Sequence, residues 1–168
     1  HTVSMKIVLD VMGGDLAPQA PIHGAINALK KTNNETKIIL IGDQKVIARH
    51  LKGFSSPRLS INHASESIDT SDRASKVVKS KPDSSMVVGL NLVKEKKADA
   101  FISAGNTGAQ MATSTLLLGR IPHVKRPALS VFFPAITGGK ILCDVGANPD
   151  DSATHLLQFA IMSSVYLD

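Results

Sequence analysis

The stretch AFISAGNTGAQMA, residues 100–112, changes character within a few positions. An apolar run is followed by glycines, hydroxyls and an amide over 103–108, and a helical pattern then continues to Leu118 and ends at Gly119. This order is typical of a strand, a tight loop and a helix. In parallel sheets, ligands bind where strands end and helices begin. The stretch therefore predicts both an α/β fold and a ligand-binding loop.

The rest of the chain repeats this alternation. Strands are expected at 6–12, 37–43, 59–64 and 100–105, and two more at 128–134 and 140–147 that residues 136–139 could join as a hairpin. Helices are expected at 18–31, 44–51, 85–99, 107–118 and 155–167. Helices of this length between strands imply right-handed crossovers and a mostly parallel sheet covered on both faces. We therefore expect an α/β three-layer sandwich.

The composition is that of a globular chain with a basic surface. The 168 residues are 43% hydrophobic and carry a net charge of +5, which suits an anionic ligand, an acidic partner or an anionic membrane surface as well as an ordinary basic surface. Aromatic residues make up only 4%, so stacking platforms for bases are scarce and no nucleic-acid partner is expected. The single cysteine, Cys143, cannot form a disulfide within the chain, which favours a reducing compartment.

Several catalytic classes lack their motifs in this sequence. The histidines show no metal-ligand spacing, and neither HExxH nor a Cys/His cluster occurs, so no metal site is expected. The GxSxG elbow, the GxxxxGK phosphate loop and the GxGxxG dinucleotide fingerprint are also absent, and no cofactor is expected.

The two ends of the chain carry separate expectations. The opening HTVS, residues 1–4, resembles a tag remnant, which leaves 5–168 as the folded portion. The helix at 155–167 is apolar on most faces, so we expect it to be buried on more than one side. One interpretation is a truncated chain that lacks the cover for this helix, and the alternative is a helix docked in its own domain or in a dimer.

The loop at 103–108 has the features of an anion cradle. Gly105 and Gly108 let the backbone approach a ligand closely, and Asn106 or Thr107 can cap the following helix. The free N–H groups of the first turn and the helix dipole then favour an anion, with phosphate the usual ligand. The hydroxyls of Ser103 and Thr107 add donors. The alternative is a capped helix after a tight turn, without a ligand.

A similar loop, DVMGGDLAP at 10–18, follows the first expected strand. Gly13 and Gly14 end the strand, and the carboxylates of Asp10 and Asp15 bracket them. An aspartate at the end of a strand can orient a lysine, a hydroxyl or a substrate proton. The alternative for Asp15 is that it only caps the helix entered at Pro18.

A third loop, DVGANPD at 144–150, contains Asp144, Gly146 and Asn148. Because the carboxyl ends of parallel strands meet at one edge of a sheet, we expect the three loops to converge there. The basic segment 73–85, with Arg73 and Lys81, could hold a phosphate or an acidic carrier protein, or it could be a solvated surface.

Five motifs together resemble one enzyme family: DVMGGDLAP (10–18), KPDSSMVVGLNLVKEKKADAFISAGNTGAQMA (81–112), RPAL (126–129), LCDVGANPD (142–150) and LLQFAIMSSVY (156–166). They are similar to the bacterial phosphate acyltransferases of phospholipid synthesis. The resemblance implies transfer of a fatty acyl group from acyl carrier protein to inorganic phosphate. It implies a fold like the phosphate acetyl/butyryltransferases and the isocitrate or isopropylmalate dehydrogenases, and a chain of about twice this length, whose C-terminal half is absent here.

The same resemblance implies a homodimer and a cytoplasmic enzyme attached peripherally to the inner face of the membrane. Val11, Gln110, Pro149 and the stretch DSAT (151–154) depart from the usual family residues, and none of them removes a glycine of the loops. A dehydrogenase-like enzyme of the same fold that depends on a metal, and a non-catalytic phosphate-binding module, remain alternatives.

The expected roles follow from the positions of the loops and from the chemistry. Phosphate is already an oxygen nucleophile, so the enzyme must hold it against a thioester carbonyl and stabilise an oxyanion. The expected catalytic residues are Asp10, Asn106, Thr107 and Asp144. The expected substrate- and phosphate-binding residues are Gly13, Gly14, Asp15, Arg73, Lys81, Ser84, Ser103, Gly105, Gly108, Gly146 and Asn148.

Overall fold

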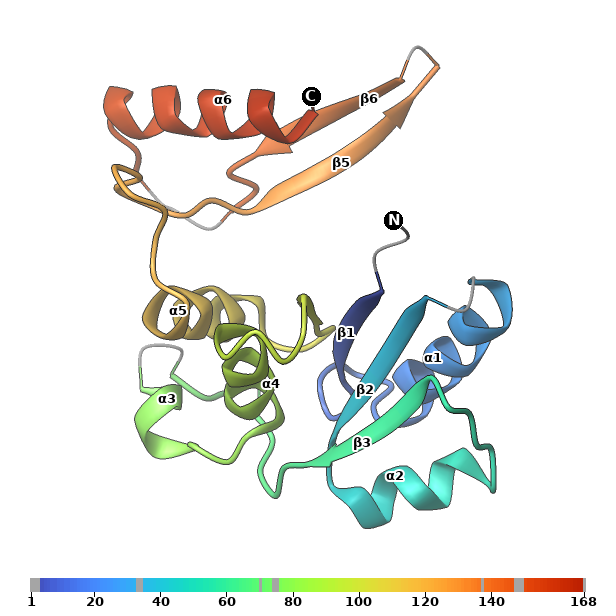
Figure 1. The fold of residues 1–168 in the computed structure, drawn as a ribbon. Coiled ribbons are helices and arrows are strands. Elements are labelled where there is room, and N and C mark those ends of the chain that lie inside the picture. The colour runs from blue at the N-terminus through green and yellow to red at the C-terminus, as the bar shows by residue number, and fades with distance from the viewer. Residues whose placement is uncertain are drawn as a thin grey trace. The chain divides into compact units, whose positions relative to one another are not determined.

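The computed structural model describes residues 4–32, 35–69, 71–73, 76–136, 138–146 and 150–167. The chain divides into two compact units, His1–Gly119 and Arg120–Asp168. Their elements are labelled in Figure 1.

The first unit contains a four-stranded sheet in the order β3-β2-β1-β4. Every neighbouring pair is parallel, and Leu9 lies opposite Leu40 on one side and Ile102 on the other. The strands are β1 (Met5–Asp10), β2 (Thr36–Gly42), β3 (Leu59–His63) and β4 (Ala100–Ile102). The helices are α1 (Gln19–Lys31), α2 (Gln44–Leu51), α3 (Val77–Ser80), α4 (Ser85–Lys94) and α5 (Thr107–Leu117).

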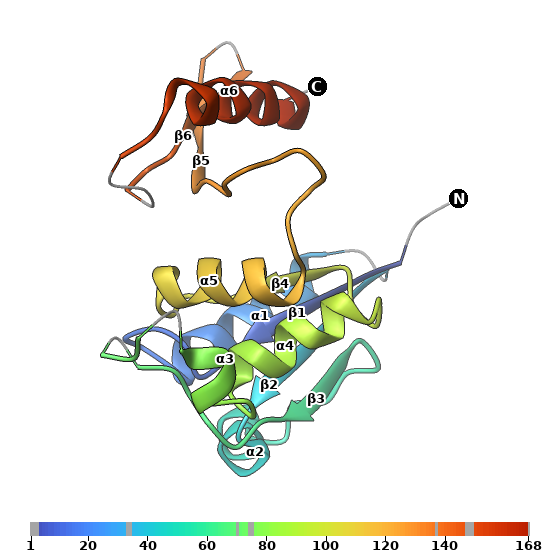
Figure 2. The same ribbon diagram turned by 90° about the vertical axis from the view of Figure 1, so that its left-hand side faces the viewer.

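Helices cover both faces of this sheet. Along β2, Ile38 and Leu40 pack into the cluster that includes α1 and α2, whereas Ile39 and Ile41 pack on the side of α4. This alternation follows from the two-residue period of a strand. Figures 1 and 2 show α1 and α2 on one side of the sheet and α4 on the other. The expected three-layer α/β sandwich is therefore confirmed for this unit.

Three helices of the first unit begin at a polar side chain that accepts a backbone N–H. The carboxylate of Asp43 accepts from Lys45 and Val46 at the start of α2. Ser84 caps α4 through the N–H of Val87. These caps satisfy amides that have no partner inside the helix. Chiefly because the Val46 amide donates to it, the pKa of Asp43 lies below its ordinary value.

The second unit contains β5 (Ser130–Ala135), β6 (Gly138–Cys143) and α6 (Ala153–Leu167). The two strands pair antiparallel, with Ala135 opposite Gly138, which confirms the expected hairpin. They form a separate two-stranded sheet. The expectation that the loop after β6 ends a strand of the main parallel sheet is therefore wrong, because a hairpin pairs with itself when no crossover helix separates its strands.

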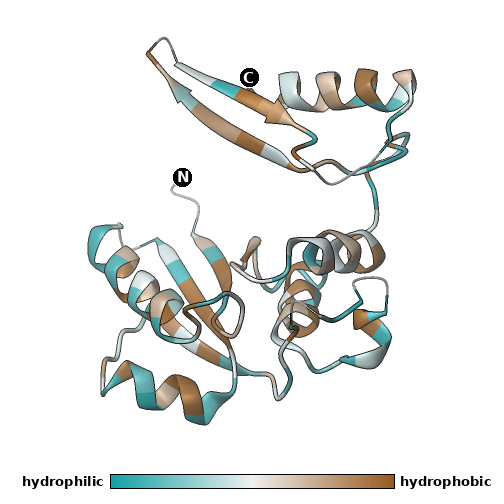
Figure 3. Ribbon diagram, turned by 180° about the vertical axis from the view of Figure 1, so that it is seen from behind, coloured by the Kyte–Doolittle hydropathy of each residue, from teal (hydrophilic) through white to brown (hydrophobic). Residues whose placement is uncertain are grey.

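The last helix, α6, keeps most of its apolar surface exposed. Within the described part of this helix, Phe159 is buried, whereas Leu156, Leu157, Ile161 and Val165 are each more than half exposed. Figure 3 shows apolar colours along β5 and α6. The expected burial of this helix on more than one side is not found within the described chain. None of the helices among the described residues is both long and apolar enough to span a bilayer.

Candidate functional site

The loops that follow β1 and β4 touch each other through two glycines. A Cβ atom added to Gly13 would lie 2.7 Å from both Asp10 Oδ2 and Ser103 Oγ. One added to Gly105 would lie 3.2 Å from the Cα atom of Gly13. A side chain at position 13 would therefore force its neighbours to move, and one at position 105 would be tightly packed against the other loop. The prediction that these two loops meet at one edge of the sheet is confirmed.

Asp10 and Ser103 tie the two loops together. The carboxylate of Asp10, only 2% exposed, accepts the hydroxyl of Ser103 at 2.8 Å and the amide of Met12 at 3.0 Å. The Ser103 hydroxyl oxygen in turn accepts the N–H of Gly105 at 3.0 Å. Asp10 thus orients a hydroxyl, one of the roles expected for it. The hydroxyl proton of Ser103 is donated to Asp10, so Ser103 is not the open donor that the sequence suggested.

The first turn of α5 keeps two amides open. Asn106 caps this helix, because its Oδ1 accepts the N–H of Ala109 at 2.9 Å. Thr107 and Gly108 are exposed, and no acceptor among the described residues bonds to their backbone N–H groups. The cradle therefore consists of these two amides and the Thr107 hydroxyl, because the Gly105 amide is already occupied.

A small open pocket, which we call the loop hollow, lies at this edge of the sheet. Its volume is about 220 Å³, and it is lined by Met12, Gly14, Asp15, Ile68, Asp69, Ala104, Gly105 and Asn106. Asp15 therefore lines the pocket, and it makes no cap for α1, whose N-cap is Pro18 without a side-chain hydrogen bond. The wall formed by Ile68 and Asp69 was not predicted. That segment, after β3, contains no glycine to mark a ligand loop.

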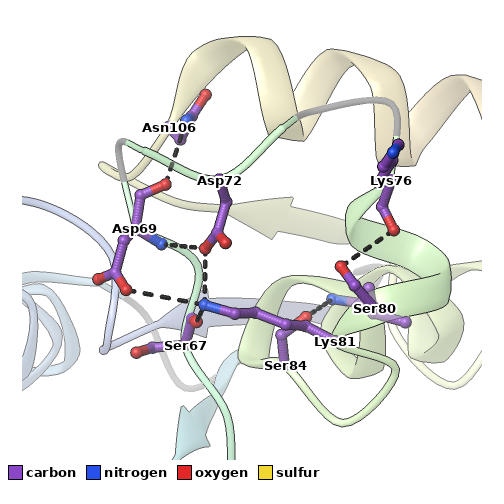
Figure 4. Close-up of polar contacts among 9 residues, drawn as sticks. Ser67, Asp69, Asp72, Lys76, Ser80, Lys81, Ser84 and Asn106 are labelled. Atoms are coloured by element: carbon purple, nitrogen blue, oxygen red, sulfur yellow. Dashed lines mark hydrogen bonds and ion pairs between the residues drawn. The ribbon is translucent and has the colours of Figure 1, made fainter.

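Lys81 is bound within the protein. Its ammonium donates to the carboxylate of Asp72 at 2.6 Å and to the carbonyl of Ser67 at 2.8 Å, and lies 3.7 Å from Asp69 Oδ2 (Figure 4). The hydrogen bond with Asp72 is the main reason that the pKa of Lys81 lies above its ordinary value and that of Asp72 below. The expected role of Lys81 as a phosphate ligand stays a prediction, and in the structure its charge is paired with Asp72.

Other expected binding residues lie elsewhere. Ser84 is fully buried and its hydroxyl caps α4, so the structure gives it a structural role, and its expected contact with substrate stays a prediction. Arg73 is exposed, and no carboxylate in the described part of the chain pairs with it. Asp144 and Gly146 belong to the second unit, after β6, and Asn148 lies outside the described residues.

The pair of Asp72 and Lys81 gives the fold a dependence on pH. Because the folded-state pKa of Asp72 is below 3.8, the pair contributes stability above that pH and loses it as the pH falls through the lowered value. Lys81, with a folded pKa above 10.5, contributes stability below that pH and loses it as the pH rises further. Asp72→Asn should therefore weaken the fold at pH 7 and lose less stability than the wild type between pH 5 and 2.

Thermal unfolding measured at intervals from pH 7 to pH 2 tests this expectation. Lys81→Met serves as the matched variant, because it removes the other half of the pair. Like Asp72→Asn, it should lose less stability than the wild type between pH 5 and 2. Two variants whose melting curves run parallel to the wild type at all pH values would show that the pair contributes nothing.

Comparison with known proteins identifies the family. The family model described as fatty acid synthesis protein matches residues 5–168. A phosphate acyltransferase of Exiguobacterium sp. is 48% identical over 166 residues, covering 98% of this chain and 50% of the relative. The phosphate acyltransferase of Halothermothrix orenii is 48% identical, covering 96% of this chain and 49% of the relative. That of Koribacter versatilis is 50% identical, covering 96% of this chain and 46% of the relative. The chain spans about half the length of the curated relatives it matches. With nearly all of its residues matched in this way, the chain belongs to the fatty acid synthesis protein family, and the likeness to phosphate acyltransferases that its motifs indicated is confirmed.

Proposed function

We propose that the protein to which this chain belongs transfers a fatty acyl group from acyl carrier protein to inorganic phosphate, giving acyl phosphate for phospholipid synthesis. The observation that carries the proposal is the start of α5, where two amides are open beside a glycine-to-glycine contact. Such a helix N-terminus suits an oxyanion. Relatives named phosphate acyltransferase match the chain across these loops.

The proposed reaction needs positioning more than it needs a strong base. An oxygen of phosphate attacks the thioester carbonyl carbon, and a C–O bond forms as the carbonyl oxygen becomes negative. The tetrahedral intermediate then collapses, the C–S bond breaks and the thiolate of the carrier leaves with the electron pair. The amides of Thr107 and Gly108 and the Thr107 hydroxyl would bind the phosphate or the oxyanion. Asp10 and Ser103 act indirectly, because their hydrogen bonds hold the two loops in contact.

The proposed partners follow from surface charge and from the family. Arg73, Lys76 and Lys79 are exposed, so the basic segment suits an acidic carrier protein. A homodimer and peripheral association with the inner face of the membrane complete the proposal, on the strength of the family resemblance alone.

Two substitutions at the start of α5 test the proposal. In the gene product expressed at its encoded length, Thr107→Val and Asn106→Ala should each reduce acyl-phosphate formation by about tenfold or more, because each disturbs the donors that face the oxyanion. Acyl phosphate is measured by trapping with hydroxylamine, with acyl carrier protein as donor.

Thr115→Val is the matched control, because it makes the same chemical change two turns further along α5, where the hydroxyl only donates to the carbonyl of Met111. Unchanged turnover in both test variants would reject the assignment of the cradle. The same protein assayed with NAD and magnesium tests the dehydrogenase alternative. Calorimetric binding of phosphate without any acyl transfer would indicate the binding module.

A further inference from the structure

We propose that Lys81 is a positioning residue of this site: it holds the segment Ser67–Asp69 as a wall of the loop hollow and offsets the negative charge of Asp69, so that an anionic acceptor can bind beside the wall. The inference rests on the proposed function, because the acceptor in question is phosphate. Its proposed donors, Thr107 and Gly108, do not line the hollow themselves but directly follow Asn106, which does. Lys81 does not line the hollow itself.

The beginning of the wall is held without Lys81. Glu66 forms a parallel bridge with Ser84, donating to the carbonyl of Asp83 and accepting the amide of Ser85. The amide of Ser65 donates to the Asp83 carboxylate at 2.8 Å, and the side-chain carboxylate of Glu66 accepts the Asp83 amide at 3.0 Å. These bonds fasten residues 65 and 66 to the turn before α4, and they would survive a change at Lys81.

The part of the wall that lines the hollow is held partly by Lys81 and partly by Asp72, whose amide donates to the carbonyl of Asp69 at 3.1 Å. Beyond Glu66, the carbonyl of Ser67 accepts the Lys81 ammonium, and the amide of Asp69 donates to Asp72 Oδ2 at 2.7 Å. That same Asp72 oxygen is bound by Lys81 at 2.6 Å (Figure 4). Lys81 therefore supports Ile68 and Asp69 from both sides. A longer bond, 3.4 Å from Asn106 Nδ2 to the carbonyl of Asp69, joins this wall to the cap of α5.

The charges around the hollow give Lys81 a second effect. Asp15 and Asp69 line the hollow, and no lysine or arginine is among its described lining residues. Two carboxylates would repel a phosphate, so a nearby positive charge favours binding. The Lys81 ammonium lies 3.7 Å from Asp69 Oδ2 and is not part of the lining of the hollow. It can thus weaken the repulsion without touching the ligand.

Kinetics of the full-length protein separate this role from a purely structural one. Lys81→Met should raise the KM for phosphate about tenfold with a smaller change in kcat, because the lost effect is mainly electrostatic. Lys81→Arg should recover part of the affinity. Asp69→Asn combined with Lys81→Met should recover part of it, because the carboxylate that lines the hollow is then gone, although Asp72 still lacks its partner. Lys30→Met is the matched control, because this exposed lysine of α1 lies outside the basic segment and has no ion pair with any described residue.

Two measurements do not require acyl transfer. Calorimetric titration with inorganic phosphate should show the same loss of affinity in Lys81→Met, and hydrogen exchange at the Asp69 amide should become faster in Lys81→Met but not in Lys30→Met. If the wild type makes no acyl phosphate, the proposed function fails, while these two measurements still decide the role of Lys81. Unchanged phosphate affinity in Lys81→Met, or no recovery in the double variant, would overturn the inference.

Discussion

Gly13→Val should lower kcat/KM for acyl-phosphate formation by about 100-fold, because it forces apart two loops that must lie in contact. A Cβ atom at this position would lie 2.7 Å from Asp10 Oδ2 and from Ser103 Oγ, and 3.1 Å from the Cα atom of Gly105. These neighbours are backbone or hydrogen-bonded groups, so they cannot yield easily. Overpacking of this kind costs about 1–3 kcal/mol of stability. The assay is steady-state kinetics together with thermal unfolding.

Gly24→Ala is the control for this prediction. Gly24 lies inside α1, and nothing lies within 4 Å of the Cβ atom that would be added there. Because alanine favours a helix over glycine by about 1 kcal/mol, this variant should be slightly more stable and fully active. Gly13→Ala, a milder change at the site, keeps the test informative if the valine variant does not fold. Wild-type activity in Gly13→Ala would contradict the close contact of the loops.

The second large effect is expected for Asp10→Ala. This substitution leaves the Met12 amide and the Ser103 hydroxyl without their acceptor at a buried position. An unsatisfied buried group costs about 1–3 kcal/mol, and release of the Ser103 hydroxyl frees the loop that carries Gly105. We therefore expect a lower melting temperature and a fall in turnover of about 100-fold.

A double-mutant cycle separates the effect of removing the Asp10 carboxylate from the effect of removing the Ser103 hydroxyl. Ser103→Ala should have a smaller effect than Asp10→Ala, because the Met12 amide keeps its acceptor. Asp10→Ala combined with Ser103→Ala should cost less stability than the two single changes added together, with a coupling of about 0.5–3 kcal/mol. Strict additivity would mean that the carboxylate and the hydroxyl act independently.

The sequence predicted the sheet and its two glycine loops well because these depend on local patterns. The strand at 6–12 and the helix at 18–31 were found close to β1 and α1, and Asn106 caps a helix as its position suggested. The expected strand at 100–105 is shorter in the structure, because β4 pairs with β1 only over 100–102. Ser103 then turns away to bond with Asp10.

The role of Lys81 could not be deduced from the sequence. A basic segment shows that lysines are available, but it does not show which carboxylates will lie beside them. Asp72 and Asp69 reach Lys81 only because the segment after β3 folds back along the turn before α4. The short helix α3 within this segment was likewise not expected, since four residues are too few to show the periodicity of a helix.

The sequence by itself determined the alternation of strands and helices, the glycines at the strand ends and the family, because each depends on residue type and spacing along the chain. Only the tertiary structure decided that Gly13 and Gly105 touch, that Ser103 gives its proton to Asp10, and that the loop after β6 belongs to a separate hairpin. The contacts between Gly13 and Gly105 and between Asp10 and Ser103 join residues about 90 positions apart, and their geometry depends on how the whole sheet and its covering helices pack.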